Sequence, residues 1–541
     1  VVSIVLRAPD GSTVILRESN SPDPTAGELR PHVIAGTYPV DLRPEESLGR
    51  LSGIERQGTW VLEAQAATGA PPVIDAWALH VEDEETVIED SERFLIPIAA
   101  RTPGADASLW RTHLQLVNPT ARPMEVGLTT GPLSEVAPRR TSLVVPAGHR
   151  IALSDAFHAL GLNRGSSTLV VDASRDVATA ALIVAETTGV RQALPVLEPD
   201  TASQVVATHH LFFLDGEATG RSNVGVTDTA GRGGIATFLF TDAHSGEPVG
   251  DPVPLLIPPD GVATVTDVHA AAGIAPGLEL RGVVSLSDPG LWPWASVVDD
   301  TSSDAIFVAG QPLTALARRT LPVVSRGIGR TGELWTTDLR LLSEDEGTIH
   351  ARFLPADGSS GVDAHIAVSA GATVILDDLV ASLFGLASAT GALILEPEDP
   401  ELAWAAEARI RSLRADRRTG QTLPTVATPA RGALLVPWLG DGTDTRSNLV
   451  ITETAGAQLT LSATVLDAQG RIAGSAFSVE LDGGAIRILD PLVAADAQGC
   501  ADCSILLTPT GGAGRFTALA SVLDLVTGDP VTIAGWDLSS Q

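Results

Sequence analysis

Few residue clusters in this chain combine the types and spacing that chemistry needs. Cys500 and Cys503 form a C-x-x-C pair, which can bind zinc, exchange electrons or close a disulfide. A zinc site needs two more ligands, and none is evident nearby. A thioredoxin-like role needs a βαβ context, which this stretch does not offer. We expect a disulfide that closes a local loop, with free thiols as the alternative.

Hydrolytic and metal centres lack their usual signatures. A subtilisin-type site needs a serine nucleophile, a histidine base and an orienting aspartate, but no Gly-Thr-Ser, His-Gly or Gly-x-Ser-x-Gly segment occurs. The adjacent His209 and His210 would point to opposite faces of a strand. The sequence contains no lysine, which excludes Schiff-base chemistry and a P-loop. We predict no catalytic residue and no organic cofactor within this chain.

Calcium is the one metal for which the sequence offers weak candidates. They lie in two similar acidic loops and are Asp215, Glu217, Asp441 and Asp444. Carboxylate oxygens suit calcium, but no loop spacing defines a ligand set. An Arg-Ser-Asn trio follows each loop, at 221–223 and 446–448. The trio could read a ligand, but we favour a structural role, in which the arginine pairs with a carboxylate at a sheet end and the asparagine closes a turn.

The two trios belong to a long internal repeat. The segment 220–231 returns at 445–456, and we call this displacement along the chain the duplication offset. The same offset relates Pro97, Arg101, Trp110, Thr112, Leu114 and Leu116 to Pro322, Arg326, Trp335, Thr337, Leu339 and Leu341. Fixed-period similarity indicates a tandem array of one structural unit. Because Arg111, Arg221, Thr336 and Arg446 occupy the same place in successive units, we infer four units arranged as a duplicated pair.

Each unit reads as short strands, glycine turns and one brief helix. An aspartate follows a glycine turn at a closely similar spacing and precedes a short apolar segment; these residues are Asp155, Asp267, Asp378 and Asp490. We expect helix N-caps, with metal ligation as the alternative. Trp294 and Trp404 are expected at equivalent packing positions. The pattern predicts an all-β fold with one β-sandwich per unit, joined as independent beads by short connectors. Pro195 and Pro424 would stop strand pairing at two unit ends.

The N-terminal segment 1–82 resembles a known family. Leu6–Ser12, Leu51–Gly53, Gly58–Leu62 and Asp75–Leu79 are similar to the P domain (P/Homo B domain), which follows the catalytic domain of subtilisin-like proprotein convertases and many secreted bacterial proteases. The resemblance implies a jelly roll that stabilises or regulates a serine protease domain, and it carries over no catalytic residue. Trp60 and Trp77 are expected in its core. Because its first strands should precede Val1, we expect a truncated module.

The predicted organisation is therefore an N-terminally truncated P-domain-like jelly roll (1–82), an acidic linker (83–93) and four β units (94–200, 201–314, 315–425 and 426–541). The formal charge of −31 disfavours nucleic acid and anionic lipid as partners. No apolar run reaches the roughly 20 residues of a membrane helix. The chain opens on Val1 without a signal peptide, so we expect a fragment or processed product.

Two functions follow as hypotheses. In the first, the chain is the accessory, C-terminal region of a secreted bacterial serine endopeptidase, and its partner is a protease domain upstream of Val1. In the second, it is a secreted or cell-surface adhesion protein without a protease, whose repeats bind surface or matrix glycans or proteins through many weak contacts.

Overall fold

The structure, a computed structural model, describes most of the chain. The described residues are 2–8, 11–17, 60–66, 91–104, 109–133, 138–186, 189–198, 207–214, 220–300, 304–329, 332–413, 418–426, 428–440, 444–500, 503–525 and 528–538. They form antiparallel sheets and four one-turn helices, so the predicted all-β class is confirmed. No helix in these ranges is long and apolar enough to cross a membrane.

A small three-stranded sheet represents the N-terminal module. Its strands are β1 (Val2–Arg7), β2 (Thr13–Arg17) and β3 (Val61–Ala66), in the order β2-β1-β3. The expected hairpin of β1 and β2 is present, with Leu6 opposite Val14. Trp60 packs against the small core of Leu6, Val14 and Leu16, in keeping with the expected core position. Trp77, the remaining jelly-roll strands and most of the acidic linker lie outside the described residues.

Units 1 and 3 are each a sheet folded over its own core. Unit 1 contains β4 (Glu92–Pro103), β5 (Leu109–Val117), β6 (Met124–Thr130), β7 (Arg140–Val145), β8 (Arg150–Leu153), α1 (Ala156–Ala159), β9 (Gly165–Ala173), β10 (Ala178–Ala185) and β11 (Arg191–Leu194). Unit 3 contains β20 (Thr314–Ala315), β21 (Arg319–Ile328), β22 (Leu334–Ser343), β23 (Gly347–Pro355), β24 (Val362–Val368), β25 (Thr373–Leu376), α3 (Leu379–Ser382), β26 (Ala389–Pro397), β27 (Ala403–Leu413) and β28 (Arg418–Leu423). The long strands β4 and β21 pair with a strand on each side of the fold and so join its two layers.

Units 2 and 4 are sandwiches of two separate sheets. Unit 2 contains β12 (Thr208–Leu214), β13 (Gly220–Asp228), β14 (Gly234–Asp242), β15 (Pro248–Ile257), β16 (Val262–Val265), α2 (Val268–Ala271), β17 (Leu280–Leu286), β18 (Leu291–Asp299) and β19 (Ala305–Ala309). Unit 4 contains β29 (Leu434–Val436), β30 (Thr445–Glu453), β31 (Leu459–Leu466), β32 (Phe477–Leu481), β33 (Ile486–Leu489), α4 (Pro491–Ala494), β34 (Ser504–Gly512), β35 (Phe516–Asp524), β36 (Pro530–Ala534) and β37 (Trp536–Asp537). The predicted β-sandwich with one short helix per unit is confirmed.

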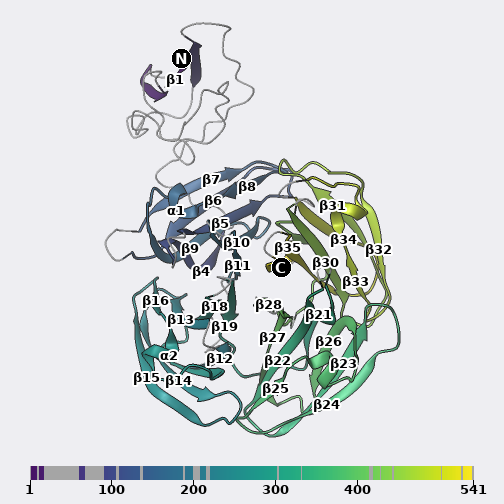
Figure 1. Cartoon of the computed structure of the whole chain (residues 1–541). Coiled ribbons are helices and arrows are strands. Elements are labelled where there is room, and N and C mark those ends of the chain that lie inside the picture. Colours follow the sequence, from purple (N-terminus) through teal and green to yellow (C-terminus); the bar gives the residue numbers. More distant parts are fainter. Residues whose placement is uncertain are drawn as a thin grey trace.

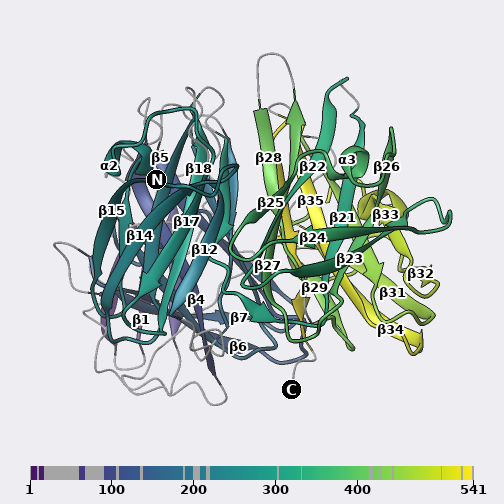
Figure 2. The ribbon, with the colours of Figure 1, turned by 90° about the horizontal axis from the view of Figure 1, so that it is seen from below.

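The four units close into a ring, which corrects the expectation of independent beads. Figure 1 views the ring along its axis, with the units following one another in order of colour. At the centre, β36 of unit 4 contacts β11 and β28, and β19 of unit 2 contacts the same two strands, so that each of the four strands has two neighbours. Figure 2 shows the ring from the side, with units 1 and 2 beside units 3 and 4. Repeat period predicts the units but not their contacts, because the contacting side chains come from strands far apart in sequence.

Two of the repeated residues link neighbouring units directly. Thr227 of unit 2 donates a hydrogen bond from its Oγ1 to the carbonyl of Pro97 in unit 1, at 2.8 Å. Thr452 of unit 4 makes the same bond to the carbonyl of Pro322 in unit 3, at 2.9 Å. The duplication offset therefore relates whole pairs of units, and the ring has an approximate twofold axis.

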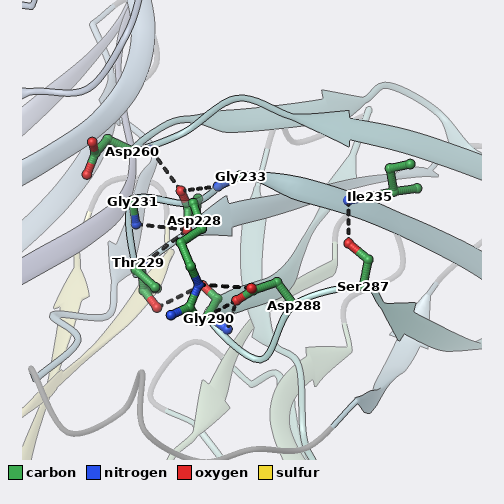
Figure 3. A network of polar contacts seen from close by, with 11 residues as sticks. Asp228, Thr229, Gly231, Gly233, Ile235, Asp260, Ser287, Asp288 and Gly290 are labelled. Carbon is green, nitrogen blue, oxygen red and sulfur yellow. Dashed lines mark hydrogen bonds and ion pairs between the residues drawn. The ribbon is translucent and has the colours of Figure 1, made fainter.

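The Thr-Ala-Gly segment recurs because a buried carboxylate organises the loop around it (Figure 3). Asp228 is 2% exposed, and its carboxylate accepts backbone N–H bonds from Ala230, Gly231, Gly233 and Asp260 at 2.7–3.1 Å. In unit 4, Glu453 is fully buried and accepts bonds from Ala455, Gly456, Gly484 and Arg515 at 2.7–3.0 Å. A carboxylate with this many N–H partners satisfies backbone donors that a tight loop would otherwise leave unpaired.

All four predicted helix N-caps occupy their expected position. The carboxylates of Asp155, Asp267 and Asp490 accept backbone N–H bonds from the first turns of α1, α2 and α4. Asp378 stands at the N-cap of α3 but makes no side-chain cap bond. Its carboxylate instead accepts a bond from Arg326 Nε at 2.7 Å. The repeated Arg101 makes the same contact with Asp155 at 2.7 Å, which explains why this arginine recurs.

The expected equivalence of Trp294 and Trp404 is wrong. Trp294 lies opposite Gly225 in the β13–β18 pairing, whereas Trp404 lies opposite Ser343 in the β22–β27 pairing. Ser343 corresponds by the unit spacing to Asp228, so the two indoles lie at different places along their paired strands. Both are buried, and each indole N–H donates within the core. The recurrence of tryptophan at the unit spacing did not reveal this shift in strand register.

Candidate functional site on the central axis

The ring encloses a cavity of about 620 Å³ along its axis. Its wall is formed mainly by β11, β19, β28 and β36, each an edge strand of its sheet. Apolar side chains such as Phe307 and Val531 alternate there with polar groups. Gln192 donates to Ser296 Oγ at 3.0 Å, and the related Gln421 donates to Ser521 Oγ at 2.9 Å. Closing the ring also covers four strand edges that would otherwise be open to pairing with other chains.

One end of the central strands carries a pair of buried carboxyl groups. Asp304 precedes β19 and Asp529 precedes β36, at positions related by the duplication offset; they are 4% and 2% exposed. Asp304 Oδ2 accepts the N–H of Gly420 in unit 3 at 2.8 Å, and Asp529 Oδ2 accepts the N–H of Arg191 in unit 1 at 3.1 Å. The two carboxyl groups lie close enough for each to act on the other. Burial raises the pKa of Asp304 well above its usual range, and the charge of Asp529 raises it further.

A third buried acid, Glu407, lines the axial cavity. It is 3% exposed and accepts a hydrogen bond from Gln311 Nε2 at 3.1 Å. Burial raises the pKa of Glu407 to about 8, although the nearby positive charge of Arg319 opposes the shift. At neutral pH this side chain is therefore mostly protonated. Arg319 lies over the ring of Trp404, 5.1 Å from its centroid.

A second cavity, of about 290 Å³, opens between units 2 and 3. The guanidinium groups of Arg340 and Arg409 both lie 4.6 Å from the ring centroid of Phe213. Arg340 is 2% exposed and binds Glu279 through two bonds of 2.7 and 2.8 Å. Arg411 pairs with the buried Asp338 at 2.6 Å. The cavity thus presents both hydrogen-bond donors and carboxylate acceptors within a charged lining.

The matching interface between units 4 and 1 carries two tryptophan contacts. Trp438 takes the place of Phe213 by the duplication offset, and its ring stacks on His113 at 6.4 Å. Trp536 takes the place of Gln311 and packs edge-on against Phe94 at 5.0 Å. The chain runs directly from unit 2 to unit 3, whereas units 4 and 1 are joined only by their contacts. Both interfaces bury apolar side chains, since Phe212 and Phe213 pack against Leu342 and Ala405 between units 2 and 3, but the two tryptophans occur only at the interface between units 4 and 1.

Most of the calcium candidates cannot be placed. Asp215, Glu217 and Asp441 lie outside the described residues. Asp444 is described, and its carbonyl accepts a bond from Leu525 N at 2.8 Å. Within the described part of the chain, no group of three or more metal-ligating side chains occurs. The structure brings no described ligand set to this loop, and calcium binding there stays a prediction.

The remaining candidates have structural surroundings. Cys500 and Cys503 are joined by a disulfide, with their Cα atoms 5.9 Å apart, just before β34. His209 and His210 are both buried, and burial lowers the pKa of each to about 4, so both imidazoles are neutral at pH 7. Arg221 pairs with Asp300 just after β18, as the structural interpretation of the trio predicts. The predicted turn closed by the asparagine is wrong: Asn223 lies within β13, and its Oδ1 accepts the N–H of the helix cap Asp267.

Sequence reasoning missed the axial carboxyl pair and Glu407. The pair had one available signal, since Asp304 and Asp529 are related by the same duplication offset as the other repeated residues. Neither aspartate stands in a recognisable motif. Glu407 has no such signal, because Ala180 occupies the corresponding strand position in unit 1.

No protein-family model matches the sequence, and no curated protein matches it. Among solved structures, the chain is similar to a crystal structure of a tetra-tandem repeat in the extending region of a large adhesion protein. The similarity covers 81% of this chain and 97% of that chain, at 14% sequence identity and a TM-score of 0.11.

Proposed function

We propose that this chain is a non-catalytic part of a secreted protein, in which the closed ring acts as a rigid scaffold beside a P-domain-like module. One observation carries the proposal: the repeated residues have structural partners. Thr227 and Thr452 bind neighbouring units, Arg101 and Arg326 bind helix N-caps, and Asp228 and Glu453 organise loops. These residues therefore recur because they hold the fold of each unit and the contacts between units in place.

The disulfide supports an extracellular location. Thiols are kept reduced in most cytosols, so a structural disulfide is typical of secreted and cell-surface proteins. Cys503 is fully buried beside the core of unit 4, where oxidation would stabilise the preceding loop. Mass spectrometry of protein isolated from its native source, alkylated before reduction, tests this point. A free thiol at both positions would contradict it.

We further propose that the scaffold accompanies a serine endopeptidase domain encoded upstream of Val1. The support is the P-domain resemblance of residues 1–82. The test is to recover the coding sequence upstream and to treat the complete protein and this chain with a fluorophosphonate probe. Labelling of the complete protein alone is expected. An upstream sequence without a serine protease domain, or a complete protein that does not react, would refute the association.

The charged cavity between units 2 and 3 favours adhesion as a second candidate function. Its arginines donate hydrogen bonds and its carboxylates accept them, which suits the hydroxyl and carboxyl groups of glycans or matrix proteins. We expect binding on a glycan and matrix-protein array, and weaker binding after Arg409→Ala.

The control for that experiment is Arg352→Ala, because Arg352 is 56% exposed on β23 and is absent from the cavity lining. Equal loss of binding in both variants would place the interaction elsewhere. No binding by the unmodified chain, with or without added calcium, would remove adhesion as a function of this region.

A further inference from the structure

The centre of the ring brings together one carboxyl group from each half of the duplicated chain. Asp304 belongs to unit 2 and Asp529 to unit 4, which stand opposite each other across the axis. Two residues of opposite units that also bond to units 3 and 1 can meet only at the centre, so the pair lies near the approximate twofold axis. Asp304 also accepts the backbone N–H of Gly420 in unit 3, and Asp529 accepts the backbone N–H of Arg191 in unit 1. All four units therefore meet at this pair.

A hydrogen bond between these two buried side chains requires a proton. An ionised carboxylate only accepts hydrogen bonds, so two ionised carboxylates cannot bond to each other. One of the two must be protonated, and its O–H then donates to the other, which stays ionised. Both remaining bonds also need acceptor oxygens, because Gly420 and Arg191 donate backbone N–H groups. A single proton satisfies all three bonds.

We propose that Asp304 and Asp529 form one proton-binding site that holds the four units together, and that loss of this proton loosens the ring. With the proton removed, two negative charges face each other within a buried site, and like charges at contact distance repel strongly. The repulsion acts between units 2 and 4 and strains the bonds to units 1 and 3. The contacts between the four units would thus be more stable at acidic and neutral pH than at alkaline pH.

The pair has charged neighbours of both signs, and the positive charge of Arg191 on β11, whose N–H bonds to Asp529, opposes retention of the proton. Asp299 at the end of β18 adds a negative charge near Asp304. Asp524 at the end of β35 donates its N–H to the carbonyl of Asp529. On the side of units 2 and 3, Asp304 lines the charged cavity, where the positive groups are Arg340, Arg409 and Arg411 and the further acids are Glu279 and Asp377. Arg340 is held by Glu279 and Asp377, which limits its effect on the pair.

The direction of the pH dependence follows from the raised pKa of Asp304. The folded ring keeps the proton at pH values where an unfolded aspartate, with a pKa of 3.8, has lost it. The stabilisation is therefore complete below that value and is lost as the pH rises through the pKa of the pair. Glu407 changes stability in the same direction, because its pKa is also raised. An experiment must separate the two groups.

The test uses thermal unfolding of the full chain between about pH 5 and pH 10, a range over which ordinary aspartates stay ionised. The background is Glu407→Gln, which removes the titration of that side chain. In this background we expect the unfolding midpoint to fall as the pH rises. Adding Asp304→Asn should flatten the fall, because the amide N–H₂ donates to Asp529 without a titrating proton. Asp529→Asn should act alike, which covers the case in which one variant does not fold.

Two measurements on the unmodified chain complete the test. Carbon-13 NMR of the side-chain carboxyls should show one aspartate that titrates far above the others. Protection factors at the amides of Gly420 and Arg191, which are corrected for the base catalysis of exchange, should fall over the same pH range, because the loosened ring separates both donors from their acceptors. The proposal is overturned if no aspartate carboxyl titrates above about pH 6, well beyond the usual value, or if Asp304→Asn leaves the pH dependence of the Glu407→Gln background unchanged.

Discussion

The buried carboxylate of Glu453 offers the sharpest test of how the repeated segment works. It is fully buried and accepts four backbone N–H bonds of 2.7–3.0 Å, from Ala455, Gly456, Gly484 and Arg515. A hydrogen bond to a charged group contributes about 1.5–3 kcal/mol, so four such bonds set an upper limit of about 12 kcal/mol. The bonds are not independent, and water can enter the emptied site. We expect Glu453→Ala to lower the free energy of unfolding by at least about 3 kcal/mol.

The conservative variant separates charge from shape. Glu453→Gln keeps one acceptor oxygen but turns an amide N–H₂ towards two N–H donors, so we expect a loss of about 2 kcal/mol. Glu480→Ala is the control, because Glu480 is exposed on β32 of the same unit and should change stability by less than about 0.5 kcal/mol.

The assay is equilibrium unfolding in urea combined with amide exchange. Ring proteins can unfold in steps, so a local measurement is needed beside the global one. Amides of Ala455, Gly456 and Gly484 should lose protection in both Glu453 variants, and the matching loop around Asp228 in unit 2 should not. If Glu453→Ala costs less than about 1 kcal/mol and leaves these amides protected, the loop does not depend on the carboxylate.

Three further predictions concern the ring and its ionisable groups. Trp536→Ala should cost roughly 3 kcal/mol in unfolding experiments by opening the apolar contact with Phe94, whereas Gln311→Ala, at the related position, should cost only about 1 kcal/mol; equal losses would contradict the assigned asymmetry. The pKa of Glu407 is raised from 4.5 to about 8, so this side chain should make the free energy of unfolding decline as the pH rises across that interval, by at most about 1.4 kcal/mol per pH unit. Glu407→Gln should remove this decline from the pH profile of the Tm, and an unchanged profile would refute the assignment. Reduction of the Cys500–Cys503 disulfide, which spans a sequence separation of 3, should cost roughly 2 kcal/mol by calorimetry, since so short a loop adds little constraint to the unfolded chain; a loss of the whole cooperative transition would show that the bond does more.

The all-β class, the four units and their helix caps were accessible from sequence for a local reason. Strand alternation, glycine turns and an aspartate before a short apolar segment each act within one unit, and their physical basis involves neighbours in the chain. For the arginine of the trio, Arg221, the interpretation succeeded in the same way, since a strand-end arginine commonly meets a strand-end carboxylate; for Asn223 it failed, because its partner Asp267 is far away in the sequence. The register of Trp294 and Trp404 failed because strand pairing can shift without changing the repeat length.

The sequence by itself determined the fold class of each unit, because the repeat period, the glycine turns and the helix-capping aspartates are all local features of the chain. Only the tertiary structure decided that the units close into a ring, since closure depends on side chains that are very far apart in the sequence. Trp536 of the last unit packs against Phe94 of the first, and Asp529 reaches Asp304 across the axis. From sequence alone, an aspartate is expected to be a solvated, ionised carboxylate, and only its neighbours in the fold can change that expectation. The same residue type caps a helix at Asp490 and shares a proton at Asp304, and burial makes that difference.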